Sequence, residues 1–143
     1  MPGYSIWYLL KPNHPLHARV AELNAKLDLT PLPAHVPILN NIQLLSTAKI
    51  LFSSYVKKAK PVFTIASRPM FLSFENEKRV SMKLECKEQF REWEFPVLSR
   101  AQMFFHDEVN DVSFDQQIIL PEEYELVIMD TRYLNKSLWK PLD

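Results

Sequence analysis

The chain has 143 residues, of which 47% are hydrophobic, and its 17 Lys and Arg residues balance its 17 Asp and Glu residues. This length and composition predict one domain, residues 1–143, with a substantial core, and the zero net charge excludes the overall basic field by which proteins bind duplex DNA. The single cysteine, Cys86, excludes an internal disulfide and a cysteine-based metal site, and it fits a reduced compartment.

The first elements predicted are a strand and a helix. Residues 4–10 are aromatic and aliphatic almost throughout, which is typical of a buried strand. Asn13 is placed to cap a helix whose first turn contains Pro15. Pro31 and Pro33 end the helical pattern. Four apolar side chains fall on one face of this helix: Leu16, Val20, Leu23 and Leu27.

An extended segment, residues 35–45, and a second helix come next. Strand alternation puts His35, Pro37 and Leu39 on one face of the segment and Val36, Ile38 and Asn40 on the other. Ser46 or Thr47 is placed to cap the helix, which runs to about Lys58. A lysine cluster near the helix end suits the helix dipole better than a nucleic-acid patch: Lys57, Lys58 and Lys60.

The second half of the chain reads mainly as strands. Residues 61–74 predict a strand bent near Arg68-Pro69, followed by a polar turn at 75–78 and a hairpin partner at 79–86. Residues 87–93 predict a short helix. Three further strands are predicted at residues 96–106 (centred on 103–105), 112–120 and 124–130. Few helices and many strands in hairpin order predict an α+β fold with mainly antiparallel sheet.

The chemistry that the chain could perform is narrowed by its single glycine, Gly3. A P-loop, a dinucleotide-binding fingerprint and a nucleophile elbow all require more glycine, so they are excluded. A phosphate would have to be held by side chains or helix N-termini. No apolar run approaches the ~20 residues of a membrane span, and residues 1–10 lack the pattern of a signal peptide. We therefore expect a cytoplasmic protein without a membrane partner.

Three stretches of the chain carry a family resemblance. They are the opening strand 5–9, the helix 15–27 with the approach 32–36 to His35, and the ending 124–132 with Trp139. Together they extend over the whole chain, and they resemble the 2H phosphoesterase superfamily, close to its small cyclic phosphodiesterases. The resemblance implies a two-lobed α+β domain, with mainly antiparallel sheets, a few helices packed outside, and a cleft between the lobes.

The resemblance also implies a metal-free chemistry without a cofactor. Each lobe of such a protein supplies one His and one Ser or Thr. One imidazole takes a proton from the attacking water or hydroxyl, the other gives a proton to the leaving oxygen, and the hydroxyls stabilise charge on phosphate. Members act on 2′,3′-cyclic phosphates, ADP-ribose cyclic phosphate, 2′–5′ oligonucleotides, RNA ends or cyclic dinucleotides.

The chain departs from the motif of that family in both lobes. His35 matches the first histidine, but Pro37 stands at the hydroxyl position and has neither a hydroxyl nor a backbone N–H. Two registers remain open for the second motif. One places Ala101 and Met103 at the His and Ser/Thr positions, and the other places Val97 and Ser99 there. The candidate substitute for the second imidazole is then His106, which the neighbouring Asp107 and Glu108 are placed to orient. An exposed position at a strand end is the competing interpretation of His106, and a structural role competes with catalysis for His35.

Weaker candidates are weighed against ordinary structural roles. Ser99 and Arg100 are candidates for phosphate contact, with a surface loop as the competing interpretation. Trp7 and Tyr8, like Trp139, are candidates for stacking on a nucleobase, and a core role competes for each. His14 and His17 are expected to be solvated at the start of the first helix.

Three interpretations of function follow. The chain is a divergent phosphodiesterase that uses His35 and His106, or a relative that binds a nucleotide or an RNA end with reduced or lost turnover. The alternative is a protein–protein interaction module whose cleft is filled by Pro37, Met103 and Phe104. Loss of the motif side chains favours binding with reduced or lost catalysis.

Overall fold

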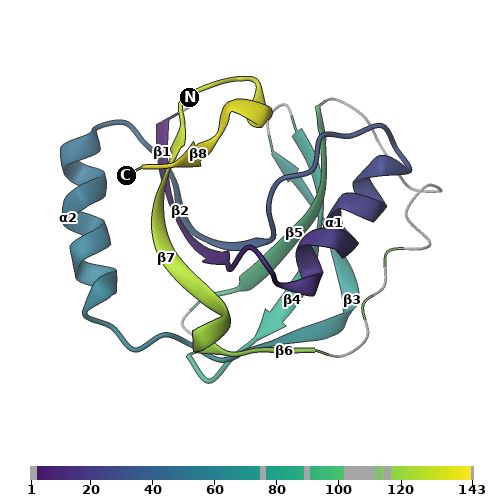
Figure 1. Ribbon diagram of the computed structural model, residues 1–143, viewed down its shortest axis with the longest axis horizontal. Helices are drawn as coiled ribbons and strands as arrows, with labels where there is room; N and C mark the ends of the chain where they lie inside the picture. Colours follow the sequence, from purple (N-terminus) through teal and green to yellow (C-terminus); the bar gives the residue numbers. More distant parts are fainter. Residues whose placement is uncertain are drawn as a thin grey trace.

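The computed structural model describes residues 3–74, 77–88, 91–101, 112, 114 and 117–142. Over these residues the strands form two four-stranded antiparallel sheets (Figure 1). Sheet A has the strand order β2-β1-β7-β8, and sheet B has the order β5-β4-β3-β6. The predicted α+β class with mainly antiparallel sheets is confirmed.

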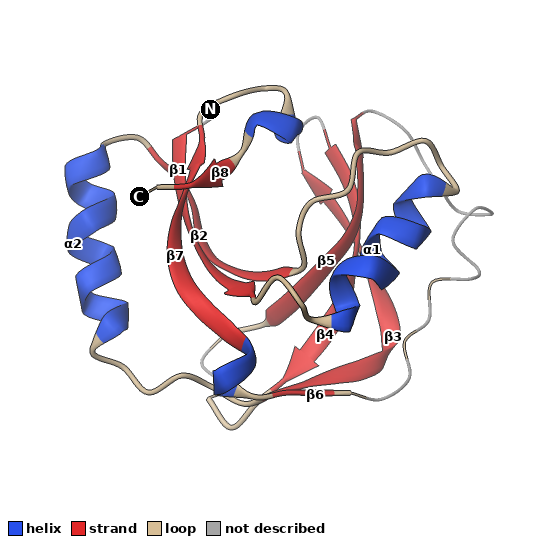
Figure 2. Cartoon of the chain, viewed as in Figure 1, coloured by secondary structure: helices blue, strands red, loops and turns tan. Residues whose placement is uncertain are grey.

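The strands of sheet A are β1 (Gly3–Leu10), β2 (His35–Ile42), β7 (Tyr124–Thr131) and β8 (Lys140–Pro141). Those of sheet B are β3 (Phe63–Phe74), β4 (Glu77–Glu85), β5 (Trp93–Ala101) and β6 (Ile118–Ile119). The helices are α1 (Pro15–Ala25) and α2 (Leu45–Val56), with short 3₁₀ turns η1 (Pro121–Glu123) and η2 (Lys136–Leu138). Figure 2 shows α1 and α2 on opposite sides of the paired sheets.

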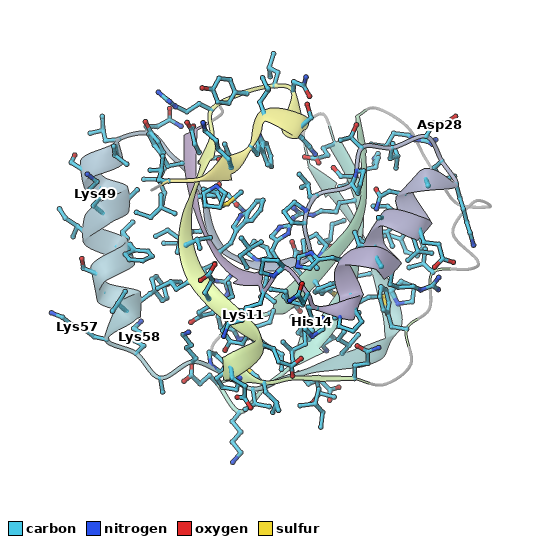
Figure 3. All side chains as sticks on the ribbon, viewed as in Figure 1. Lys11, His14, Asp28, Lys49, Lys57 and Lys58 are labelled. Atoms are coloured by element: carbon cyan, nitrogen blue, oxygen red, sulfur yellow. The ribbon has the colours of Figure 1, made fainter. Side chains whose placement is uncertain are left out.

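Strand alternation along β1 separates the core from the inner face of sheet A. Tyr4, Ile6, Tyr8 and Leu10 are buried in the core, against which apolar side chains of α2 also pack. The intervening Ser5 and Trp7 turn to the other face, where they line a pocket. Figure 3 labels Lys49 in α2 and Lys57 and Lys58 just after its end, and all three are exposed. Helix α2 therefore covers sheet A from outside.

Helix α1 confirms three members of the predicted apolar face, since Leu16, Val20 and Leu23 are all buried. The helix ends at Ala25, so Leu27 lies beyond it and is only partly buried. Its N-cap differs from the prediction: His14 caps the helix, and its Nδ1 accepts the Leu16 N–H at 3.1 Å. An imidazole nitrogen here does the work expected of the Asn13 amide, because either group can accept a backbone N–H. The expected cap of α2 at Ser46 or Thr47 is likewise wrong, because the helix already begins at Leu45.

Strand β2 follows the predicted alternation only as far as Ile38. Pairing with β1 joins Trp7 to Pro37 and Ile6 to Leu39, so Ile38 is an extra residue that forms a bulge. The bulge reverses the faces of the residues that follow it. Asn40 consequently lines the pocket, and Leu39 packs against the core, which is the opposite of the prediction.

Three further predictions of secondary structure are corrected in the second half. The predicted helix at 87–93 is wrong: Trp93 begins β5, and the described residues 87, 88, 91 and 92 are not helical. Of the predicted strand 112–120, the described residues form a strand only at Ile118–Ile119. Of the predicted turn at 75–78, residues 77 and 78 belong to β4, which begins at Glu77. The bend expected near Pro69 is confirmed by a register shift between Ile65 and Pro69.

A buried asparagine joins α1 to β5. The Asn24 side chain is 2% exposed, and its Nδ2 donates to the Val97 carbonyl at 2.8 Å and to the Val20 carbonyl at 2.7 Å. Val97 is itself an extra residue of β5, where the pairing with β4 shifts register between Val80 and Ser81. The amide therefore satisfies a carbonyl at a point where the β-ladder is interrupted.

We predict that Asn24→Ala lowers the free energy of unfolding by about 1–3 kcal/mol, because the Val97 carbonyl stays buried without its donor. Urea unfolding of the variant and of the exposed Asn13→Ala control measures the difference. Equal small effects in both variants would show that Asn24 is not an anchor.

Candidate functional site

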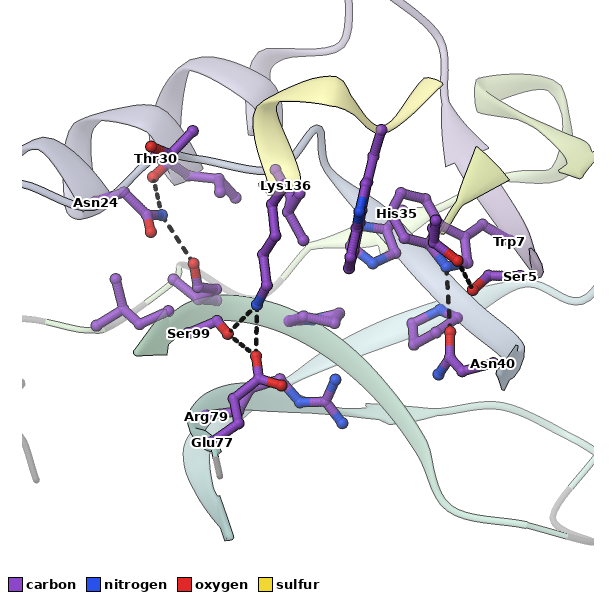
Figure 4. A pocket seen from close by; sticks show the side chains of 18 of the residues that line it. Ser5, Trp7, Asn24, Thr30, His35, Asn40, Glu77, Arg79, Ser99 and Lys136 are labelled. Carbon is purple, nitrogen blue, oxygen red and sulfur yellow. Dashed lines mark hydrogen bonds and ion pairs between the residues drawn. The ribbon is translucent and has the colours of Figure 1, made fainter. Parts of the chain in front are cut away.

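A pocket of about 440 Å³ lies between the inner faces of the two sheets (Figure 4). Sheet A contributes side chains from β1, β2 and β7, and sheet B contributes residues of β4 and β5. Helix α1 and the segment after β7 complete the wall. The polar and aromatic residues that matter below are Ser5, Trp7, His35, Asn40, Glu77, Arg79, Ser99, Thr131, Lys136 and Trp139.

His35 is the imidazole of this pocket. Its side chain is nearly buried, at 3% exposure, and its ring stacks on Trp7 with centroids 3.6 Å apart and planes inclined by 18°. Its Nδ1 lies 2.7 Å from the Pro33 carbonyl oxygen. Because a carbonyl only accepts, Nδ1 carries the hydrogen and the neutral ring keeps its lone pair on Nε2. Nε2 has no hydrogen-bond partner among the described residues, so it is available to a group in the pocket.

Burial keeps this imidazole uncharged. Desolvation lowers the pKa of His35 from 6.5 to about 3, against the opposing effect of the hydrogen bond to Pro33. The positive charges of Arg79 and Lys136 lower the pKa further. At neutral pH the ring is therefore uncharged and its Nε2 can accept a hydrogen bond. An anion in the pocket would offset part of the effect of these cations on the pKa.

The opposite wall carries a hydrogen-bonded group of three residues, Glu77, Ser99 and Lys136. Lys136 Nζ lies 2.5 Å from Glu77 Oε1 and 2.6 Å from Ser99 Oγ, and the Ser99 hydroxyl donates to Glu77 Oε1. In Figure 4 the Lys136 side chain extends from the C-terminal segment to meet both partners on sheet B. Lys136 therefore joins the segment after β7 of sheet A to strands β4 and β5 of sheet B, and its ammonium lies at the pocket wall.

Arg79 brings a second cation to the same wall. It lies opposite Ser99 in the pairing of β4 with β5, and its Nη2 is 2.7 Å from Glu94 Oε1. Burial raises the pKa of the Glu94 carboxyl, and the neighbouring Arg79 and Arg91 work against that rise.

Sheet A supplies hydroxyl and aromatic groups. Thr131 Oγ1 donates to the Gly3 carbonyl at 2.6 Å, so the Ser5 hydroxyl donates to Thr131 at 2.8 Å. Trp139 is partly buried and meets Trp7 edge-on, with centroids 6.1 Å apart. On this side the pocket presents aromatic rings, and the hydroxyl hydrogens of Ser5 and Thr131 are engaged in hydrogen bonds within the protein.

The structure brings several predicted site residues together. His35, Pro37, Ser99 and Trp7 all line the pocket. Val97 lines the pocket as well. The register that puts Val97 at the histidine position and Ser99 at the hydroxyl position therefore places both in the same pocket as His35. His106 and Met103 lie outside the described residues, as does Phe104.

Two predicted ligand contacts are corrected. Tyr8 is 3% exposed in the core, where its ring contacts Tyr124, Phe63 and Trp93 and burial raises its pKa to about 12. Alternation along β1 turns it away from the pocket that Trp7 lines. Arg100 donates to the Leu27 carbonyl at 3.1 Å and is not among the described residues that line the pocket.

The prediction that His14 and His17 are solvated is wrong, because both rings form hydrogen bonds within the fold. His14 Nε2 lies 2.6 Å from Glu123, and its Nδ1 caps α1. His17 Nδ1 accepts the Ala34 N–H at 2.9 Å, so its Nε2 carries the hydrogen that faces the Leu10 and Lys11 carbonyls. His17 thereby fixes the chain one residue before His35.

Sequence reasoning missed Lys136, Glu77 and Arg79. Arg79 had a signal, since it alternates with the apolar Val80 and Met82 and so belongs to the polar face of its strand. Lys136 had none, because it lies in an irregular segment and meets partners 37 and 59 residues away.

Within the described ranges, no three His, Cys, Asp or Glu side chains gather as a metal site would require. No helix of the described chain is long and apolar enough to cross a lipid bilayer. No family model, no curated protein and no solved structure matches this chain.

We predict that His35 makes the fold sensitive to acid. The imidazole has a pKa of 6.5 in the unfolded chain and of about 3 in the folded chain. Between these two values the unfolded chain binds a proton that the folded chain does not, so the free energy of unfolding decreases as the pH falls. Each pH unit costs about 1.4 kcal/mol. In His35→Asn, whose amide N–H is able to replace Nδ1–H, the loss of stability between pH 7 and pH 4.5 is smaller by roughly 2–3 kcal/mol. Urea unfolding at both pH values measures it, and equal losses would contradict a buried neutral imidazole.

Proposed function

We propose that the pocket binds the phosphate of a nucleotide or an RNA end that carries a 2′,3′-cyclic or 2′–5′ phosphodiester, with slow or absent turnover. The observation that carries the proposal is His35, a neutral imidazole with Nε2 available, in a pocket that also holds the cations Arg79 and Lys136. A volume of about 440 Å³ falls within the range of small-molecule sites.

The placement of the motif residues supports the 2H phosphoesterase resemblance. His35 and Pro37 come from sheet A, Val97 and Ser99 come from sheet B, and all four line one pocket. Each sheet contributes a residue at the histidine position and one at the hydroxyl position. Of the two imidazoles and two hydroxyls of the family's motifs, this chain keeps the imidazole of His35 and the hydroxyl of Ser99.

The surviving groups suit one half of phosphodiester hydrolysis. His35 Nε2 takes a proton from water as the water oxygen bonds to phosphorus, and the phosphorus bond to the ribose oxygen breaks. The departing oxygen takes its proton from solvent, because the described part of the pocket holds no second imidazole. Members of such a set act as a unit, so loss of one lowers the rate by orders of magnitude. Binding with residual hydrolysis is the outcome that these residues support.

The alternative, an interaction module with a filled cleft, has less support. Pro37 lines the pocket and leaves it open, and the other two residues of that hypothesis, Met103 and Phe104, lie outside the described residues.

The proposal is tested by binding and turnover on one panel of 2′,3′-cyclic nucleotides, 2′–5′ oligoadenylates and cyclic dinucleotides. We expect at least one member to bind and to be hydrolysed slowly or not at all. Any hydrolysis is abolished by His35→Ala, because that imidazole is the base of the pocket. Absence of binding across the panel would overturn the proposal, and hydrolysis that survives His35→Ala would place the base elsewhere.

A second prediction concerns the missing hydroxyl. Pro37→Thr places a donor on the pocket wall beside His35, so we expect affinity for 2′,3′-cyclic AMP to rise by about fivefold or more. Pro37→Val is the matched control, because valine has the branched shape of threonine without the hydroxyl. Calorimetric titration distinguishes them, and equal affinities of the two variants would show that position 37 does not face the phosphate.

A further inference from the structure

Two side chains of the pocket wall hold the cation Lys136 in place. Its ammonium donates to the Glu77 carboxylate at 2.5 Å and to the Ser99 hydroxyl at 2.6 Å. An ammonium has three N–H groups, so two are used and one remains for a ligand. The Trp139 ring lies 5.7 Å from Nζ and adds an aromatic face on another side. The position of the charge is thus set before any ligand arrives.

The Lys136 ammonium lies beside the residues that match the second motif. Ser99 stands at the hydroxyl position of the second motif, and Val97 occupies the histidine position with an apolar side chain. Lys136 contacts that hydroxyl from the far side of the pocket, on a segment outside both motifs. A positive charge is therefore supplied next to Ser99 although the strand itself supplies none at position 97.

We propose that Lys136 is the phosphate-binding cation of the pocket and takes over the electrostatic role of the missing second imidazole, with Glu77 as its positioning residue. This inference rests on the proposed function. The ligand chemistry it names is a phosphodiester or phosphate monoester anion, whose non-bridging oxygen accepts the third N–H of Lys136.

The contact with Glu77 holds the Lys136 ammonium beside Ser99. At that place its positive charge stabilises negative charge on phosphate, and the proton for the leaving oxygen comes from solvent. This division accounts for binding that outlasts catalysis.

The test compares a phosphate-bearing ligand with its phosphate-free counterpart. Calorimetric titration with 2′,3′-cyclic AMP and with adenosine is performed on the wild type, Lys136→Gln and Lys136→Arg. Lys49→Gln, which removes the same charge from the exposed face of α2, is the matched control. Lys136→Gln is expected to weaken 2′,3′-cyclic AMP binding by about tenfold or more and to leave adenosine binding unchanged. Lys136→Arg restores most of the loss, and the control changes neither affinity.

Glu77→Gln gives an opposite and independent expectation. The amide oxygen is still able to accept from Lys136, while one negative charge leaves the pocket, so affinity for 2′,3′-cyclic AMP rises several-fold. A misfolded variant would not bind more tightly, which keeps this result separate from any structural effect of the substitution.

The outcomes distinguish the inference from the proposed function. Wild-type binding of 2′,3′-cyclic AMP that is unchanged in Lys136→Gln overturns the role of Lys136 and leaves the proposed function intact. An equal loss of 2′,3′-cyclic AMP and adenosine in Lys136→Gln also overturns it, because the lysine would then only support the fold. Absence of wild-type binding to the whole nucleotide panel overturns both.

Discussion

The hydrogen bond from His35 Nδ1 to the Pro33 carbonyl is the interaction on which the site depends. It fixes the tautomer of the ring and leaves the lone pair of Nε2 available to the pocket. Stacking on Trp7 holds the ring plane, and the side chain is almost fully buried. Two backbone contacts in turn hold the preceding residue, since Ala34 donates to His17 and accepts from the Leu10 N–H. The imidazole is thus positioned by the fold without a carboxylate partner among the described residues.

Polar side chains, and not only apolar packing, join the parts of the protein around the pocket. Asn24 ties α1 to the bulge of β5, and Arg91 donates to the Ile38 carbonyl at the bulge of β2. Lys136 ties the segment after β7 to sheet B. The first two contacts satisfy backbone carbonyls at bulges, where the β-ladder is interrupted, and the third joins side chains. These contacts join helix α1 to β5, Arg91 to strand β2, and the C-terminal segment to sheet B.

Much of the fold follows from periodicity in the sequence. The strands β1 and β7 are predictable from nearly continuous apolar runs, and the buried face of α1 from apolar residues that recur with a helical period of about 3.6. Period 2 also separates Trp7 from Tyr8, which point to opposite faces of β1. Treating both as stacking candidates overlooked this constraint. A bulge shifts the phase by one residue without a sequence signal, and for that reason Asn40 was assigned to the wrong face.

The candidate site was predictable only in part. His35 and Ser99 stand on strands and line the pocket, and motif spacing made both candidates, although a second register and a surface-loop position remained open for Ser99. His14 and His17 were misjudged because their partners, Glu123 and Ala34, become neighbours only through the tertiary fold. The same holds for Lys136, whose role depends on contacts with two distant strands.

The most direct test of the account is long-range ¹H–¹⁵N NMR of the histidine rings, with and without 2′,3′-cyclic AMP. The account predicts that His35 is neutral at pH 6, with the proton on Nδ1, and that its Nε2 resonance shifts when the nucleotide is added. A charged ring at pH 6, a proton on Nε2, or a resonance that does not respond to the nucleotide would contradict it.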